Sequence, residues 1–343
     1  MIYICERRFG DKSQLLGYKT RAKSSCNSSQ AMAEEATHRL IDTNGIKMHI
    51  AEMGSGGPTV VLLHGFPETW YTWRFQLKGL ADAGFHAVAP DLRGFGLTKC
   101  PRDSYGNFKL TPLDLVGDIV GLVYALGGDP VFVVGHDVGA FIGWNLCRMR
   151  PDLVRAYASL GIPFGGFRRP TEEGFYGNRF GVPGRAENDF ARFDTATVLK
   201  NIYTLFCRSE LQIAGPDEEI MDLVTTSDPI PSWLTEEFIK VQSELYEKSG
   251  FECPLCFTYR DRMRAFELMA PWINMPVTSR CLYITGKDDY VRKFPGLEEY
   301  VTGGGMKRDV PNLVGVAVLP GGHFVEEDSP EEVNSLLIRF FKE

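Results

Sequence analysis

The sequence predicts an α/β fold in which a mostly parallel sheet has helices on both faces and carries an inserted helical segment. From Thr37 onward, short apolar runs alternate with segments of helical periodicity, which is typical of βαβ units. Residues 166–271 break this alternation, because they are rich in charged residues, aromatics and helix formers, and strands return only afterwards. We therefore expect a core formed by residues 37–165 and 272–343, with residues 166–271 as a helical cap over the carboxyl edge of the sheet.

The predicted sheet begins with a hairpin and continues with buried strands. Leu40–Asp42 and Met48–Ala51 flank Asn44-Gly45, a dipeptide that favours a tight hairpin turn. Val60–Leu63 and Ala87–Ala89 are continuous apolar runs, as expected of strands that are buried on both faces.

A helix and a strand lead into the middle of the predicted core. Leu113–Leu126 has helical spacing and stops at Gly127-Gly128. The strand Val131–Val134 runs into Gly135-His136-Asp137-Val138-Gly139, and Ala140–Met149 follows as a helix. The remaining predicted elements are the strands Ala156–Leu160, Cys281–Thr285 and Val314–Leu319, and a final helix after Pro330.

The composition favours a soluble enzyme that acts on a small molecule. The formal net charge of -7 argues against a nucleic-acid partner, and no run reaches the roughly 18 apolar residues that a membrane span requires. Eight scattered cysteines favour reduced thiols in the cytoplasm, and either a monomer or a homodimer is compatible with the sequence. The pair Cys253 and Cys256 has CxxC spacing, but no second pair or nearby His completes a zinc site, so we expect no metal.

Residues 1–35 differ from the rest of the chain. They are basic and contain serines, a composition found in organelle transit peptides, but they lack a clear amphipathic pattern. A disordered tail or a start at Met32 fits equally, so organelle import is an alternative to a cytoplasmic location.

The segment Gly135-His136-Asp137-Val138-Gly139 has the frame of the nucleophile elbow, G-x-S-x-G, with Asp in the place of Ser. The glycines permit a tight strand-to-helix turn that exposes the central side chain. A solvated aspartate on a surface turn is the simpler alternative. The strand before the motif and the helix after it favour the elbow, and with it the α/β-hydrolase fold with Asp137 as nucleophile.

Two downstream residues complete the order nucleophile, acid, histidine. Asp289, preferred over Asp288, lies on the loop after Cys281–Thr285, and His323 lies on a glycine-rich loop after the last strand. The loop after Val60–Leu63 supplies one backbone N–H of the oxyanion hole in this fold, here that of Phe66, and the residue after the nucleophile, Val138, supplies the other.

An aspartate nucleophile narrows the chemistry. A carboxylate attacks an sp3 carbon and displaces oxygen or halide, which leaves an alkyl ester on the enzyme. A histidine can then activate water to hydrolyse that ester. Epoxides and haloalkanes are the two substrate classes that fit.

The chain resembles the soluble epoxide hydrolases, most of all those of plants. The resemblance covers residues 37–343, and its most specific blocks are His64-Gly65-Phe66-Pro67-Glu68-Thr69-Trp70, Asp91-Leu92-Arg93-Gly94-Phe95-Gly96, Gly135-His136-Asp137 and Gly322-His323-Phe324. It implies an epoxide hydrolase that makes vicinal diols and requires no cofactor. Fatty-acid epoxides are one substrate class that the resemblance suggests.

The resemblance also implies further site residues. Two cap tyrosines protonate the epoxide oxygen in that family, and Tyr176 and Tyr259 match their motifs. The remaining expected pocket residues are His64, Pro67, Trp70 and His136.

Val138 departs from the family pattern, which has Trp after the nucleophile. In haloalkane dehalogenases that Trp donates its N–H to the halide, so Val138 counts against dehalogenation and alters the epoxide pocket. A hydrolytic dehalogenase and a non-catalytic ligand-binding protein remain the alternatives. The complete set of nucleophile, acid, histidine and two tyrosines argues against a pure binder.

Overall fold

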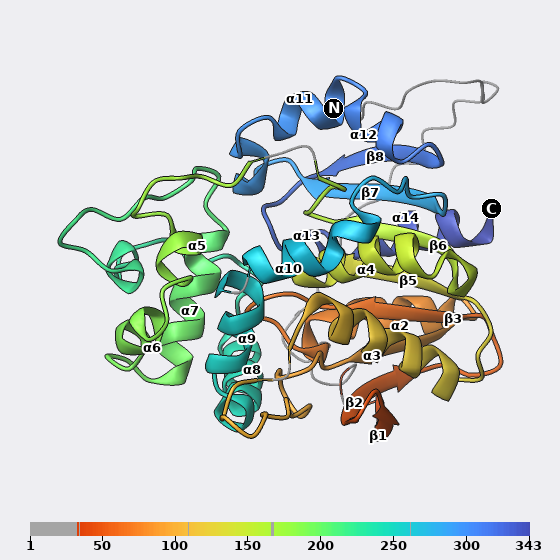
Figure 1. Cartoon of the computed structure of the whole chain (residues 1–343), viewed down its shortest axis with the longest axis horizontal. Helices are drawn as coiled ribbons and strands as arrows, with labels where there is room; N and C mark the ends of the chain where they lie inside the picture. The colour runs from red at the N-terminus through yellow and green to blue at the C-terminus, as the bar shows by residue number, and fades with distance from the viewer. Residues whose placement is uncertain (1–32, 34, 109, 166–167, 261) are drawn as a thin grey trace, which may run out of the picture.

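The computed structural model describes residues 33, 35–108, 110–165, 168–260 and 262–343, and one eight-stranded sheet forms its centre (Figure 1). The strand order is β1-β2-β4-β3-β5-β6-β7-β8. The strands span Thr37–Thr43 (β1), Ile46–Met53 (β2), Thr59–Leu63 (β3), His86–Pro90 (β4), Val131–His136 (β5), Val154–Leu160 (β6), Arg280–Gly286 (β7) and Leu313–Leu319 (β8). The first two strands pair antiparallel with each other and β2 pairs antiparallel with β4, whereas all other pairs are parallel. The predicted α/β fold with a mostly parallel sheet is confirmed.

Every strand predicted from the sequence is present, and most are longer than the apolar run that predicted them. The clearest case is β5, which continues past Val134 because Gly135 and His136 pair with Ser159 and Leu160 of β6. Backbone pairing does not require apolar side chains, so the strand reaches the residue before Asp137. The predicted basic tail of residues 1–35 lies, apart from residues 33 and 35, outside the described residues.

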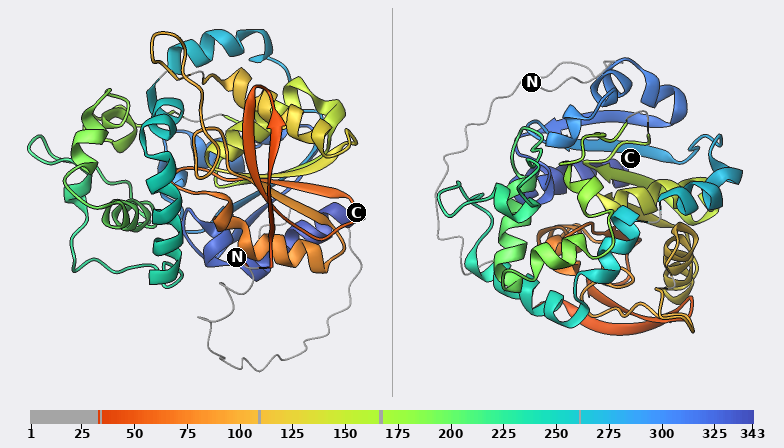
Figure 2. Two further views of the ribbon diagram at one scale, coloured as in Figure 1. Left: turned by 90° about the horizontal axis from the view of Figure 1, so that it is seen from below. Right: turned by 60° about the vertical axis from the view of Figure 1, so that its left-hand side comes forward.

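Helices cover both faces of the sheet. On one face α2 (Arg74–Asp82) packs against α14 (Pro330–Lys342), and on the other α3 (Pro112–Ala125) packs against α4 (Val138–Met149) (Figure 2). The sequence pattern did not predict α2. Its inward face carries the buried polar residues Arg74 and Gln76, which weaken the apolar periodicity of a helix.

The start of α3 is encoded locally. Thr111 accepts a hydrogen bond from the backbone N–H of Asp114, Asp114 accepts one from the N–H of Thr111, and Pro112 occupies the first helical turn. This capping box stabilises the helix by about 1 kcal/mol.

The regular elements described between β6 and β7 are all helices, apart from one isolated bridge between Phe175 and Ile213, and loops connect them. The elements are α5 (Tyr176–Arg179), α6 (Arg185–Phe190), α7 (Thr195–Phe206), η3 (Ile220–Leu223), α8 (Glu236–Ser249), α9 (Glu252–Leu255), η4 (Cys256–Arg260), α10 (Arg262–Met269) and η5 (Ala270–Trp272). Of these, α5 to α9 stand together beside the sheet, on the left of Figure 1.

The remaining helices are short and occur in both halves of the chain. They are η6 (Tyr290–Lys293), α11 (Leu297–Thr302), α12 (Gly305–Asp309) and α13 (Val325–Asp328), and two further 3-10 turns are η1 (Trp70–Trp73) and η2 (Pro151–Leu153). No helix within the described part of the chain combines the length and apolarity needed to cross a bilayer.

Candidate active site

The turn between β5 and α4 holds Asp137 in a strained backbone conformation, with φ 47° and ψ −112°. Such a φ is uncommon for a residue with a side chain and occurs most often at functional sites. The turn needs glycine on both sides: a Cβ on Gly139 would collide with the carbonyl oxygen of Leu63, and one on Gly135 would collide with that of Gly139. The geometry is therefore that of the elbow expected from the motif.

The Asp137 carboxylate faces two different groups. Its Oδ1 accepts a hydrogen bond of 3.0 Å from the backbone N–H of Phe66, and its Oδ2 lies 3.8 Å from Nε2 of His323. Burial raises the pKa of this carboxyl, but His323 and the Phe66 N–H outweigh burial, and the net pKa is lowered. The side chain is 23% exposed, so a charged carboxylate is accessible in an otherwise enclosed site.

His323 is oriented by Asp289. The Nδ1 atom lies 3.2 and 3.3 Å from the two carboxylate oxygens of Asp289, which in turn accepts a hydrogen bond from the N–H of Val291. Because a carboxylate can only accept, Nδ1 carries the proton, and Nε2 is left to act as a base when the ring is neutral. Asp288 is exposed, so the structure brings Asp289 to the histidine, as expected from the sequence.

Charge around His323 favours its protonated form. Burial lowers the pKa of this imidazole, but the carboxylates of Asp289 and Asp137 more than compensate and raise it to about 10. His323 and Asp137 therefore form an ion pair near neutral pH. The Nε2 atom has no hydrogen-bond partner among the described residues.

The two tyrosines expected in the site lie together opposite the elbow. Tyr176 in α5 and Tyr259 in η4 have ring centroids 5.9 Å apart, and Tyr259 packs edge-on against Phe66 at 5.6 Å. Burial raises the pKa of both phenols, and the nearby Asp137 charge acts in the same direction. Both hydroxyls are therefore protonated at neutral pH and can donate hydrogen bonds.

Two of the residues expected in the substrate pocket, His64 and Trp70, contact other parts of the protein. His64 is fully buried, with Nδ1 2.9 Å from the carbonyl oxygen of Gly65 and Nε2 accepting the N–H of Leu92. Trp70 packs edge-on against His38 and His49. These contacts engage both ring nitrogens of His64 and the ring of Trp70, and a lining role for either residue stays a prediction.

His136, also expected in the pocket, has partners on both ring nitrogens. It has no exposed surface, and its Nδ1 lies 2.8 Å from Glu68 Oε2 while its Nε2 donates to the carbonyl oxygen of His323 at 2.9 Å. The ring therefore supports the catalytic loop from beneath. Of the expected pocket residues, Pro67 remains next to the site through its peptide bond to Phe66, and its carbonyl oxygen accepts the hydroxyl of Tyr203.

Glu68 is a supporting residue that the sequence analysis did not single out, although it lies in one of the blocks that carry the family resemblance. It accepts hydrogen bonds from the N–H of Gly65 and the hydroxyl of Thr72, besides its contact with His136. Burial opposes its charge, but His136 lowers its pKa to about 2. For neighbouring Glu326, burial and the charge of Glu68 raise the pKa, so that acid is neutral.

Tyr290 is a second residue that the sequence analysis missed. It follows Asp289 directly, and its hydroxyl lies 2.8 Å from that of Tyr176. The one available signal was its position next to the predicted acid. The sequence contains no feature that pairs it with a residue 114 positions earlier.

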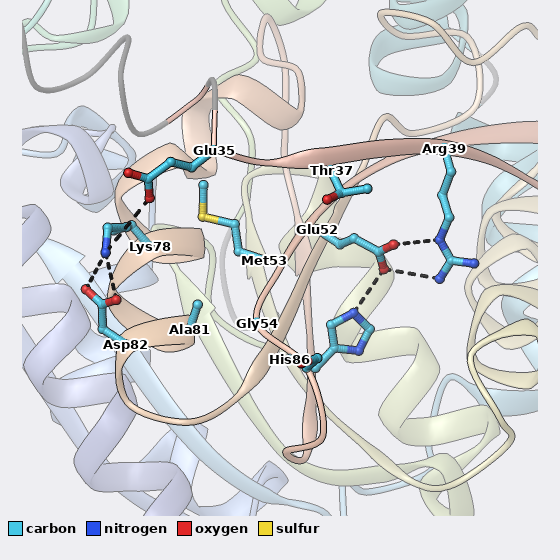
Figure 3. A pocket seen from close by; sticks show the side chains of 11 residues that line it. Glu35, Thr37, Arg39, Glu52, Met53, Gly54, Lys78, Ala81, Asp82 and His86 are labelled. Atoms are coloured by element: carbon cyan, nitrogen blue, oxygen red, sulfur yellow. Dashed lines mark hydrogen bonds and ion pairs between the residues drawn. The ribbon is translucent and has the colours of Figure 1, made fainter.

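An open groove of 420 Å³ lies elsewhere, between β2, α2 and the start of β4 (Figure 3). Glu52 there pairs with Arg39 and His86, and Lys78 pairs with Asp82. His86 begins β4, so the groove lies at the amino end of the parallel strands, opposite the edge that carries Asp137. Because its principal charges are paired internally, we do not assign it a reaction.

The comparisons with known proteins agree with this geometry. The sequence model of the Alpha/beta hydrolase family matches residues 60–336. The chain is 43% identical over 320 residues to Epoxide hydrolase 2 of Siraitia grosvenorii, covering 90% of this chain and 99% of the relative. It is 32% identical over 326 residues to Epoxide hydrolase A of Mycobacterium tuberculosis, covering 89% and 97%.

Solved structures give the same result. The crystal structure of an epoxide hydrolase from Vigna radiata superposes with a TM-score of 0.83 at 38% identity, covering 90% of this chain and 98% of that one. The structure of potato (Solanum tuberosum) epoxide hydrolase I superposes with a TM-score of 0.80 at 36% identity, covering 90% and 99%.

Proposed function

The chain belongs to the alpha/beta hydrolase family and, within it, to the epoxide hydrolases, and from this membership we propose that it converts epoxides to vicinal diols through a covalent ester on Asp137. The observation that carries the proposal is the partly exposed Asp137 carboxylate, oriented by the Phe66 N–H and facing the buried pair of His323 and Asp289. A carboxylate in this setting is suited to attack carbon.

In the first step, the Asp137 carboxylate attacks one epoxide carbon and the C–O bond of the ring breaks. The departing oxygen develops negative charge and takes a proton from Tyr176 or Tyr259. Their proximity to each other and their raised pKa values, caused first by burial, support this role, because both enter the step as O–H donors. The products of the step are an alkyl ester on Asp137 and a tyrosine phenolate.

In the second step, water attacks the ester carbonyl. Ester formation removes the negative charge of Asp137, which is one of the two carboxylates that hold the pKa of His323 high. The pKa of the imidazole then falls, so His323 can release its proton to solvent and accept one from the attacking water. Asp289 retains the ring orientation and stabilises the imidazolium that forms.

Backbone N–H groups stabilise the tetrahedral oxyanion of this step. The Phe66 N–H already donates to Asp137 Oδ1. When Oδ2 attacks the epoxide carbon, Oδ1 becomes the carbonyl oxygen of the ester, which is the atom that the N–H must stabilise. We propose Val138 as the second donor, because it is the first residue of α4 and its N–H belongs to the unpaired first turn of the helix. Collapse of this intermediate releases the diol and restores Asp137.

A single turnover in 18O-water tests the covalent route. We expect the first diol to carry unlabelled oxygen from Asp137 and the peptide that contains Asp137 to gain 18O, because water attacks the carbonyl carbon of the ester. Enzyme and a styrene-type epoxide are mixed in equimolar amounts. Mass analysis of that peptide and of the diol then measures both labels. Turnover without label in Asp137 would mean direct attack of water on the epoxide and would refute the mechanism.

The two tyrosines make a second prediction. We expect Tyr176→Phe and Tyr259→Phe each to slow ester formation by about 10²-fold. This is the lower end of the range for loss of a positioned general acid, because the other tyrosine remains as a proton donor in each variant. Rapid-quench measurement of the covalent ester reports this step separately from hydrolysis. Tyr105→Phe, at a residue that is 89% exposed, serves as the control. Unchanged ester formation in both site variants would exclude the tyrosines as acids.

We further propose that residues 166–271 act as a cap that encloses the epoxide between Tyr176, Tyr259 and the elbow. The aromatic surroundings of these tyrosines, with Phe180 and Phe206 in ring contact with Tyr176, favour an apolar substrate such as a fatty-acid epoxide. The side chain of Val138 offers no N–H donor for a halide, which weighs against a dehalogenase.

Location and assembly also belong to the proposal. Six cysteines of the described residues are free thiols, which supports a reducing compartment such as the cytoplasm. A monomer or a homodimer is compatible with the activity, since every proposed site residue comes from one chain.

A further inference from the structure

Tyr290 is buried in the active site but has no part in the proposed reaction so far. It is 4% exposed, and its ring lies 5.3 Å from that of His323 and 5.7 Å from that of Phe206. Asp289 caps the turn that Tyr290 begins by accepting the N–H of Val291. The same loop that orients His323 therefore also determines where the Tyr290 ring lies.

The hydroxyl of Tyr290 lies 2.8 Å from the hydroxyl of Tyr176. In the resting protein either phenol can be the donor, because each has one O–H and lone pairs. Proton transfer to the epoxide oxygen removes this symmetry. Once Tyr176 has lost its proton it can only accept, so Tyr290 must donate.

We propose that Tyr290 is a positioning residue that holds Tyr176 toward the substrate and stabilises the Tyr176 phenolate as the epoxide opens. The inference rests on the proposed function, since it concerns the acid of that reaction. It assigns a role to a third tyrosine, on the core side of the site, in addition to the two on the helical insertion.

The energetic argument is that this hydrogen bond becomes stronger during the reaction. Between two neutral phenols it is an ordinary O–H···O bond, whereas a donor to a phenolate forms a charge-assisted bond of about twice the strength. An interaction that strengthens toward the transition state lowers the barrier, whereas one of constant strength does not. Burial raises the pKa of Tyr176, and the hydrogen bond with Tyr290 lowers it in part. Tyr176 is therefore a stronger acid with this hydrogen bond than it would be without it.

Tyr290 itself is suited to remain a donor. Burial raises the pKa of its phenol, and the neighbouring Tyr176 raises it further, so Tyr290 keeps its proton while Tyr176 gives one up. The atoms balance over the cycle. The proton moves from Tyr176 to the opening epoxide oxygen, and ester hydrolysis later yields the acid form of Asp137. That acid gives its proton to the Tyr176 phenolate as the carboxylate is restored, and His323 takes back from solvent the proton that it had released.

The test is a double-mutant cycle on the rate of ester formation, using Tyr290→Phe, Tyr176→Phe and the double variant. We expect Tyr290→Phe to slow ester formation about tenfold in the wild-type background, the factor that a hydrogen bond to a charged group contributes. In the Tyr176→Phe background, where Tyr259 is the remaining acid, we expect the same change to alter the rate less than about twofold. Tyr290→Phe should lower the rate of ester hydrolysis by a smaller factor than the rate of ester formation.

Several outcomes would overturn the inference. An equal loss from Tyr290→Phe in both backgrounds, or an equal loss in the two chemical steps, would mean a purely structural role. No loss in either background would mean no role. Tyr300→Phe is the matched control, since it removes a buried hydroxyl that bonds to Asp309 away from the site. Absence of epoxide turnover in the wild type would instead refute the proposed function, and this inference with it.

Discussion

His323→Gln is expected to stop catalysis after the first step and to trap the substrate on Asp137. Glutamine has a similar size but cannot act as a general base, so the ester forms and its hydrolysis slows by about 10⁴-fold, the upper range for loss of a positioned base. The intact mass of the protein after mixing with a simple aryl epoxide should increase by the mass of one epoxide molecule. Peptide mapping should place that mass on Asp137.

The control is another His→Gln change outside the site. His86 lies in the groove at the opposite end of the sheet and pairs with Glu52, so His86→Gln should retain turnover. Continued multiple turnover by His323→Gln, or an adduct on another residue, would exclude His323 as the base of ester hydrolysis.

The second large effect concerns stability. Arg74→Met should destabilise the protein by about 3–5 kcal/mol, because it leaves the Glu327 carboxylate buried without its partner. Arg74 donates to both oxygens of Glu327 at 2.6 and 2.8 Å, and the two side chains are only 4% and 0% exposed. The pair joins α2 to α13, the helix that begins two residues after His323. Urea unfolding at neutral pH measures the change in the free energy of unfolding.

Two comparisons make this prediction specific. Arg39 forms a similar two-oxygen pair with Glu52, but its side chain is 46% exposed, so Arg39→Met should cost less than about 1 kcal/mol. Adding Glu327→Leu to Arg74→Met should recover part of the loss, since no unpaired buried charge then remains. A similar cost for Arg39→Met and Arg74→Met would contradict the argument from burial.

Burial also explains why local patterns predicted some elements and not others. The inner strands β3, β4 and β5 were found because their apolar runs are the direct consequence of being covered on both faces. Helix α2 was missed because its inward face carries Arg74 and Gln76, whose partners Glu327 and the Glu326 carbonyl lie about 250 positions away. No window of the sequence contains that compensation.

The same distinction applies to the histidines. His323 was identified by its place on a glycine-rich loop after the last strand, a local feature. His64, His136 and Trp70 were expected in the pocket because they belong to the sequence blocks that resemble epoxide hydrolases, and such a block does not show which way each side chain points. His136 is the last residue of β5, and its ring meets Glu68 and the carbonyl oxygen of His323, contacts that no local pattern reveals.

The sequence by itself determined the α/β fold, the elbow at Asp137 and the order of nucleophile, acid and histidine. Each was inferred from short local segments, in which glycines, apolar runs and strand ends have direct conformational consequences, and from the order of those segments along the chain. Only the tertiary structure decided that Glu68 and His136 support the loop of His323 and that Tyr290 meets Tyr176. Those contacts join segments between 68 and 187 residues apart, and they exist because the parallel strands bring their carboxyl ends to one edge.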